Sequence, residues 1–174
     1  MDWTGTVFEL IDTRSFSDLW YWIALAVVWS RASHYVIGVP YDMVARAARE
    51  GGQAQADLED IVRIRGARHL RIVEAAGPWL VALLALALSV LLLLGFFYGV
   101  EFAQAMALIA LPLTAVGWVS VATARATAQG PLTGEALRRR MTRHRVTVQV
   151  IGMVSVFVTA LWGMYRNLDA GPWG

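Results

Sequence analysis

An uncharged stretch of 26 residues, from position 75 to position 100, constrains this chain more than any other feature. Most of its side chains are Leu, Ala, Val and Phe. An α-helix rises about 1.5 Å per residue, so this stretch is long enough to cross a hydrocarbon core of about 30 Å. A soluble domain of 174 residues does not normally need such a segment. The sequence therefore predicts a protein that is embedded in a membrane.

Three further segments repeat the pattern. Residues 102–124 and 146–165 are uncharged over 23 and 20 positions, and residues 19–41 are apolar and aromatic but contain Arg31 and His34. Several such runs in one short chain indicate membrane spans rather than buried helices of a soluble protein. The predicted fold is an all-α integral membrane protein with four transmembrane helices, a cytoplasmic helical hairpin and an N-terminal interfacial helix.

Glycine and proline mark the boundaries within this single membrane domain. Gly51-Gly52 is expected to end the first cytoplasmic helix, and Gly77-Pro78 to separate the hairpin from the second span. Gly130-Pro131 is expected to break the chain before a helix that begins near Gly134. The expected segments of the chain 1–174 are an interfacial helix at 1–16, spans at 18–39, 76–99, 102–124 and 146–166, a cytoplasmic hairpin at 41–74, a cytoplasmic loop and helix at 126–145, and a periplasmic tail at 167–174.

The distribution of arginine predicts the orientation. All 15 basic residues are arginine, and 12 of them lie between spans one and two or between spans three and four. The arm before the first span carries one arginine against four acidic residues. By the positive-inside rule, both arginine-rich segments are cytoplasmic and both termini face outward. We therefore expect a multi-pass protein of the bacterial inner membrane, N-out and C-out.

The arginines also predict a ligand class. Guanidinium groups bind phosphates bidentately, so arginine-rich segments next to a membrane favour anionic lipid headgroups or a partner protein. These arginines flank spans and alternate with acidic residues such as Asp57 and Glu59, so nucleic acid is not an expected partner. The residues predicted to bind headgroups or a partner are Arg63, Arg65, Arg68, Arg71, Arg138, Arg139, Arg140, Arg143 and Arg145.

Small residues predict how the spans pack, because helices in lipid associate through close contact. Gly152, Ser155, Thr159 and Gly163 fall on one stripe of the fourth span. Such a stripe either closes the bundle of this chain or binds a helix of a partner. A second, shorter stripe runs through the second span.

Ionisable side chains within a span are candidates for function, because burying them is costly. Arg31 and His34 are three residues apart and share a helix face. Arg31 lies about 20 Å along the helix from Asp18, so the alternative is that both side chains reach the inner headgroups. Glu101 completes the candidate polar intramembrane site, or it is a solvated carboxylate in the turn between spans two and three.

Composition and motifs exclude several kinds of chemistry. The chain has no cysteine, which excludes disulfides, thiolate catalysis and cysteine-ligated metal clusters. Haem b needs two facing histidines, whereas His34 has no intramembrane partner and His69 and His144 lie in arginine-rich segments. No HExxH, GxSxG or P-loop motif is present. We therefore expect no cofactor, no metal and no catalytic residue.

The segment SFSDLWYWIALAVVWSRASHYVIGVPYDMVARAARE, followed by GGQAQADLEDIVRI, resembles a group of small membrane proteins of Rhodobacter- and Roseobacter-type alphaproteobacteria. Members of that group are described as a component of the SufBCD complex. The resemblance covers most of the chain and implies an association with iron–sulfur cluster assembly. Because it has no cysteine, this chain would be a membrane partner of such machinery rather than a thiolate scaffold for the cluster.

These observations favour a non-catalytic accessory or scaffold subunit of the inner membrane. Its partners would be anionic lipid headgroups and other membrane-protein subunits. The alternative is a homo-oligomeric channel for ions or protons, or a small transporter, with Arg31 and His34 in its path. A redox or biosynthetic membrane enzyme is a third class, which the three histidines make the weakest.

Overall fold

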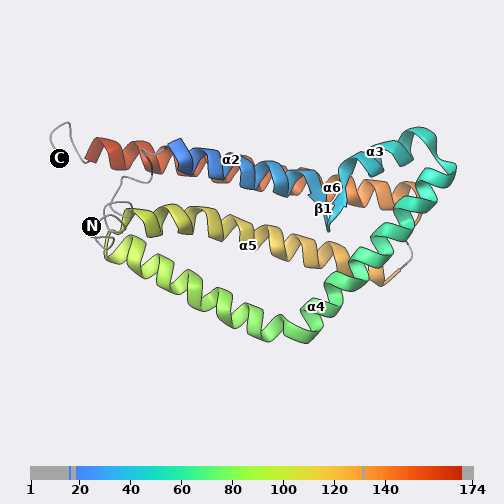
Figure 1. The fold of residues 1–174 in the computed structure, drawn as a ribbon, viewed down its shortest axis with the longest axis horizontal. Coiled ribbons are helices and arrows are strands. Elements are labelled where there is room, and N and C mark those ends of the chain that lie inside the picture. The colour runs from blue at the N-terminus through green and yellow to red at the C-terminus, as the bar shows by residue number, and fades with distance from the viewer. Residues whose placement is uncertain (1–15, 17–18, 131, 170–174) are drawn as a thin grey trace, which may run out of the picture.

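The computed structural model describes Phe16, residues 19–130 and residues 132–169. Figure 1 shows α2 alongside α6, α5 next to this pair, and α4 on the other side of α5. The predicted helix at 1–16 lies outside the described residues except for Phe16, as does the end of the predicted tail. The elements in chain order are α2 (Leu19–His34), β1 (Tyr35–Val36), β2 (Val39–Pro40), α3 (Tyr41–Glu50), α4 (Gly52–Leu92), the π-helical turn η1 (Leu93–Phe97), α5 (Glu101–Ala128) and α6 (Gly134–Asp169).

Three helices in the described part of the chain are long and apolar enough to cross a membrane. They are Gly52–Phe97, which joins α4 to η1, Glu101–Ala128 and Gly134–Leu168. Helix α2 has only 16 residues, which corresponds to about 24 Å and falls short of a hydrocarbon core of about 30 Å. The helical architecture and the membrane class are thus supported by three helices, and a fourth span stays a prediction.

The first predicted span extended to residue 39, but the helix ends at His34 and a β-hairpin follows. Val36 pairs with Val39 across a two-residue turn, in which Ile37 and Gly38 have φ angles of 52° and 75°. Positive φ at both central positions is the geometry of a type I′ turn, which suits glycine but not a β-branched residue. Ile37 is only 8% exposed, so its burial offsets the strained backbone.

Helix α4 is longer than expected. It runs without interruption for 41 residues and contains Pro78, where the sequence suggested a boundary between the cytoplasmic hairpin and the second span. Proline removes one helical hydrogen bond and clashes with the preceding turn. A helix that continues past a proline is therefore bent at that point. Figure 1 shows this bend partway along α4. The amphipathic segment that was predicted to be cytoplasmic and the apolar segment are therefore one continuous, bent helix.

One end of the bundle is a packed lobe, which we call the arginine lobe and define as residues 35–74 and 134–145. It contains the hairpin, α3, the first half of α4 and the beginning of α6, at the right of Figure 1. Gly51, with φ 62°, ends α3, and Gly134 begins α6, both as predicted. The core beneath the arginines consists of Val36, Ile37, Val39, Val44, Ala47, Leu58, Val62, Leu137 and Met141, together with Ala124 of α5.

The stripe of small residues on α6 packs within the chain. A Cβ atom added to Gly152 would lie 2.7 Å from the Trp29 ring of α2, and one added to Gly163 would lie 3.2 Å from Phe16. Ser155 Oγ donates to the carbonyl of Leu108 in α5 at 3.4 Å, and Thr159 is fully buried. Of the two alternatives, the structure shows this stripe joining α6 to α2 and α5.

Candidate functional site

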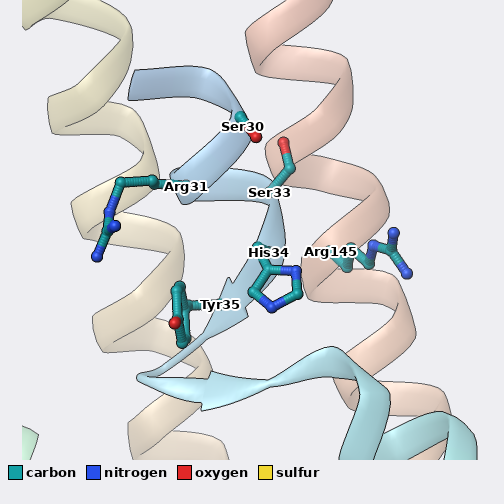
Figure 2. Close-up of a pocket in the computed structure, with 6 residues that line it drawn as sticks. All are labelled: Ser30, Arg31, Ser33, His34, Tyr35 and Arg145. Carbon is teal, nitrogen blue, oxygen red and sulfur yellow. The ribbon is translucent and has the colours of Figure 1, made fainter. Parts of the chain in front are cut away.

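A hollow with a volume of about 440 Å³ lies where α2 meets α6, at the border of the arginine lobe. The last turn of α2 contributes Ser30, Arg31, Ser33 and His34, and Tyr35 and Arg145 complete the lining. Figure 2 shows the His34 ring in the centre, with Arg31 on one side and Arg145 of α6 on the other. Arg31 and His34 therefore share one surface, as their spacing predicts, and a second guanidinium, that of Arg145, comes from a distant part of the sequence.

The two guanidinium groups of the hollow contact aromatic rings. The Arg145 guanidinium lies 4.0 Å from the centroid of the Tyr41 ring, and that of Arg31 lies 6.0 Å from the Tyr35 ring. A cation–π contact of this kind contributes about 0.5–2 kcal/mol. In the described part of the chain the ion pairs are Arg63–Asp60 and Arg139–Glu135, so neither arginine of the hollow is neutralised by a carboxylate.

Glu101 lies at the opposite end of the bundle from the hollow. It begins α5, and its Oε1 accepts a hydrogen bond of 2.9 Å from the backbone N–H of Phe16. The indole N–H of Trp22 donates to the carbonyl of Phe16 at 3.0 Å. The structure thus gives Glu101 a role in holding Phe16 against the bundle, and it does not bring Glu101 near Arg31 and His34.

A buried amide near Glu101 was not among the predicted sites. Gln104 is 3% exposed, and its Nε2 donates to the carbonyl of Gly95 at 2.7 Å. Its Oε1 accepts from Trp162 Nε1 at 3.0 Å. A Cβ atom on Gly95 would lie 2.8 Å from the Gln104 backbone nitrogen, so the π-helical turn approaches α5 very closely. The only sequence signal was a glutamine in an apolar stretch, and its partners come from two other elements.

The arginines predicted to bind headgroups all lie in the arginine lobe, on α4 and α6. The exposed ones are Arg63, Arg65, Arg68, Arg71, Arg139 and Arg143, and the half-buried ones are Arg138, Arg140 and Arg145. Arg138 donates to the side-chain oxygen of Gln55, which links α6 to α4. The ion pairs Arg63–Asp60 and Arg139–Glu135 each measure 2.6 Å, but they are exposed and join neighbours on one helix. Exposed pairs of this kind contribute at most about 1 kcal/mol, so most of the positive charge is available to a ligand.

Glu59 connects the two halves of the arginine lobe. Its Oε1 accepts a 2.8 Å hydrogen bond from the backbone N–H of Gly134, the first residue of α6, and another from Gln55 at 2.7 Å. The bond from Gly134 lowers the pKa of Glu59 below its ordinary value of 4.5, and the bond from Gln55 adds to this effect. The ionised carboxylate is therefore the form that holds α4 to the beginning of α6.

Acidification is expected to loosen the beginning of α6. A carboxyl group with a lowered pKa stabilises the fold fully above 4.5, and the contribution is lost as the pH falls from 4.5 through the pKa of the folded state. A spin label attached through Ala136→Cys, in a chain without other cysteines, should become more mobile over this window. In Glu59→Gln the same label should show a much weaker dependence on pH. An unchanged titration in that variant would contradict the assigned role of Glu59.

His144 is the buried histidine of the described chain. It is 4% exposed, and its Nδ1 lies 3.0 Å from Thr123 Oγ1 of α5. This contact joins α5 to α6 just outside the apolar stretch of α6. Among the described residues, no three His, Asp or Glu side chains are grouped so that they could hold a metal ion.

Comparisons with known proteins give no relative. No protein-family model matches the chain, and neither a curated protein nor a solved structure matches it.

Proposed function

We propose that this protein is an accessory subunit of the bacterial inner membrane, which docks to a larger membrane complex and binds anionic lipid headgroups through its arginine lobe. In this proposal α2 joins the three long helices as a fourth span, and both termini face outward. The arginine lobe then lies at the cytoplasmic surface, as the positive-inside rule requires. No catalytic step is assigned to any residue.

One observation about α4 carries the docking proposal. Between residues 78 and 94 no side chain is buried, and Trp79, Leu83 and Leu86 are 80, 65 and 63% exposed. The small residues Ala82, Ala85 and Ser89 lie in this segment and are all exposed. Small residues allow helices in lipid to approach closely. The corresponding stripe of α6 is covered within the chain, whereas the one on α4 is free for a helix of another subunit.

The arginine lobe supports the second part of the proposal. Its helices stand on a core with several fully buried side chains, among them Leu58 and Met141. The guanidinium groups are therefore displayed from packed helices rather than from loose loops. Each Lys or Arg near an anionic membrane surface contributes about 1 kcal/mol of attraction. Several of them together in one lobe give a strong preference for anionic lipid.

The resemblance to proteins described as a component of the SufBCD complex suggests iron–sulfur cluster assembly machinery as the partner. A chain without cysteine would contribute membrane attachment to such a partner and no cluster ligand through sulfur. The lobe offers the machinery a cationic cytoplasmic surface.

Gentle detergent extraction followed by native mass spectrometry tests the docking. The wild-type chain is expected in a hetero-complex. Ala85→Leu adds bulk to the free stripe and should release the partner, whereas Ala87→Leu, on the other side of α4, should retain it. A wild-type chain that is found only as a monomer, or loss of the partner in both variants, would contradict the proposed surface.

Single cysteines test the orientation, because the natural chain has none. Tyr98→Cys, at a position that is 70% exposed between η1 and α5, should react with an impermeant maleimide added outside the inner membrane. Ala67→Cys, in the arginine lobe, should react only after permeabilisation. The reverse pattern would place the lobe outside.

A channel or small transporter is the second candidate, and the exposed Arg31 and His34 at the hollow favour it. In this case native mass spectrometry would give a homo-oligomer. Purified protein would support ion flux in liposomes, and Arg31→Ala would abolish that flux.

A further inference from the structure

We propose that the hollow between α2 and α6 is a binding site for a phosphate group, as carried by an anionic phospholipid or by a water-soluble phosphate compound. The hollow has a volume of about 440 Å³, and none of the described residues that line it carries a carboxylate. Its polar groups are two guanidiniums, an imidazole and three hydroxyls. The inference deepens the proposed membrane function and rests on it, because it assigns a defined site to one headgroup.

The charges in the hollow favour an anion. Arg31 and Arg145 each carry a full positive charge that no described ion pair neutralises. The C-terminal end of α2 places a partial negative charge of about −0.5 nearby. Two full charges outweigh it, and the guanidinium fork is the side-chain group that best matches the oxygens of a phosphate.

Arg145 is held in place before any ligand binds. Its guanidinium lies 4.0 Å from the centroid of the Tyr41 ring, and the hydroxyl of Tyr41 lies 3.2 Å from Thr142 Oγ1. The contact with Tyr41 restrains the Arg145 side chain, and a side chain that is already restrained loses less entropy on binding.

The uncharged groups extend this donor set. Ser30 and Ser33 lie above the His34 ring in Figure 2, between α2 and α6, and the ring of Tyr35 packs edge-on against His34 at 5.0 Å. Hydroxyl groups donate to phosphate oxygens, which in a phosphodiester accept only. A carboxylate-free lining with many donors therefore fits phosphate better than it fits a cation or a neutral ligand.

The location fits a headgroup. Arg145 immediately precedes the apolar stretch 146–165 of α6, and the hollow adjoins the arginine lobe. Phosphates of the inner leaflet lie at such a border between the hydrocarbon region and water. The hollow is also open to water, so a soluble phosphate compound can reach it.

Titration of the purified full-length chain in detergent tests the site. Phosphatidylglycerol is the first probe, with binding followed by native mass spectrometry, and inorganic phosphate is the second probe and competitor. Each of Arg31→Gln and Arg145→Gln should weaken binding by about tenfold, the loss expected for one charge-assisted hydrogen-bond pair. Arg125→Gln, which removes an exposed guanidinium of α5 outside both the hollow and the arginine lobe, is the matched control and should bind as the wild type does.

The two probes distinguish the source of the phosphate. Binding of phosphatidylglycerol that inorganic phosphate does not displace assigns the site to a lipid, and displacement at millimolar phosphate assigns it to a soluble compound. Arg31 is exposed and makes no hydrogen bond within a core, so Arg31→Gln should fold, and Arg31→Lys should retain part of the affinity. Equal binding by the wild type and Arg31→Gln would overturn the site. A wild-type chain that keeps its partner but binds neither probe would overturn the site alone, whereas phosphate binding without any partner would overturn only the docking function.

Discussion

Gly152→Leu is expected to separate α2 from α6 and to destabilise the bundle by about 3 kcal/mol, the upper part of the usual cost of overpacking. Even the first carbon of a new side chain would lie 2.7 Å from the Trp29 ring, and the rest of leucine has no free space there. Trp29 is 6% exposed, so its ring cannot move aside into lipid without losing its own contacts. Unfolding in mixed micelles titrated with SDS measures the loss.

Gly117→Leu is the matched control for this prediction. Gly117 lies in α5, and a Cβ atom there would meet nothing within 4 Å. The two variants add the same side chain to a helix of similar hydropathy, so they differ mainly in close contact. Equal stability of Gly152→Leu and Gly117→Leu would mean that α2 does not pack on α6 through this glycine.

Local signals predicted the ends of several helices correctly. Gly51 ends α3 and Gly134 begins α6, because glycine adopts positive φ angles at little cost and its effect is confined to the backbone. The apolar stretches of α4, α5 and α6 were also predicted correctly, since length and hydropathy alone identify a helix that can cross a membrane.

The path of the chain at Pro78 and at Ile37 could not be predicted from the sequence. A proline gives the same local signal whether a helix bends or ends, and in the structure α4 continues through Pro78 and bends. At Ile37 the local preference was misleading, because a β-branched residue disfavours positive φ. The buried contacts of Val36 and Val39 hold the hairpin, and they involve elements distant in sequence.

Only part of the candidate site could be predicted, because the rest depends on contacts between elements that are distant in the sequence. A spacing of three residues on one helix placed Arg31 and His34 on one face without knowledge of the fold. Arg145 joins them only because α6 packs against α2, and no periodicity within one segment reports such a contact. Glu101 was grouped with them through its charge alone, and the structure gives it a partner at the other end of the bundle.

Leu58→Ala is expected to open the arginine lobe while the apolar helices stay folded. Leu58 is fully buried in the core of the lobe. Truncating a buried leucine to alanine typically costs about 2–5 kcal/mol, from lost transfer energy and from the cavity left behind. The lobe lies at one end of the bundle and can open locally as a separate unit. The loss of stability is therefore expected in the lobe first.

Trypsin reports this opening directly, because the arginines of the lobe are its cleavage sites. Arg125 lies in the last turn of α5 and follows Ala124, which belongs to the core of the lobe, so opening this core should also expose Arg125. No arginine lies between Arg71 and Arg125, so the cuts should release a resistant fragment of residues 72–125. Ile64→Ala, on the same helix but at a position that is 61% exposed, should be cut at the wild-type rate. If Leu58→Ala and Ile64→Ala are cut equally slowly, the lobe is not held together by the core described above. If the fragment 72–125 is itself digested, the lobe and the apolar helices unfold as one unit.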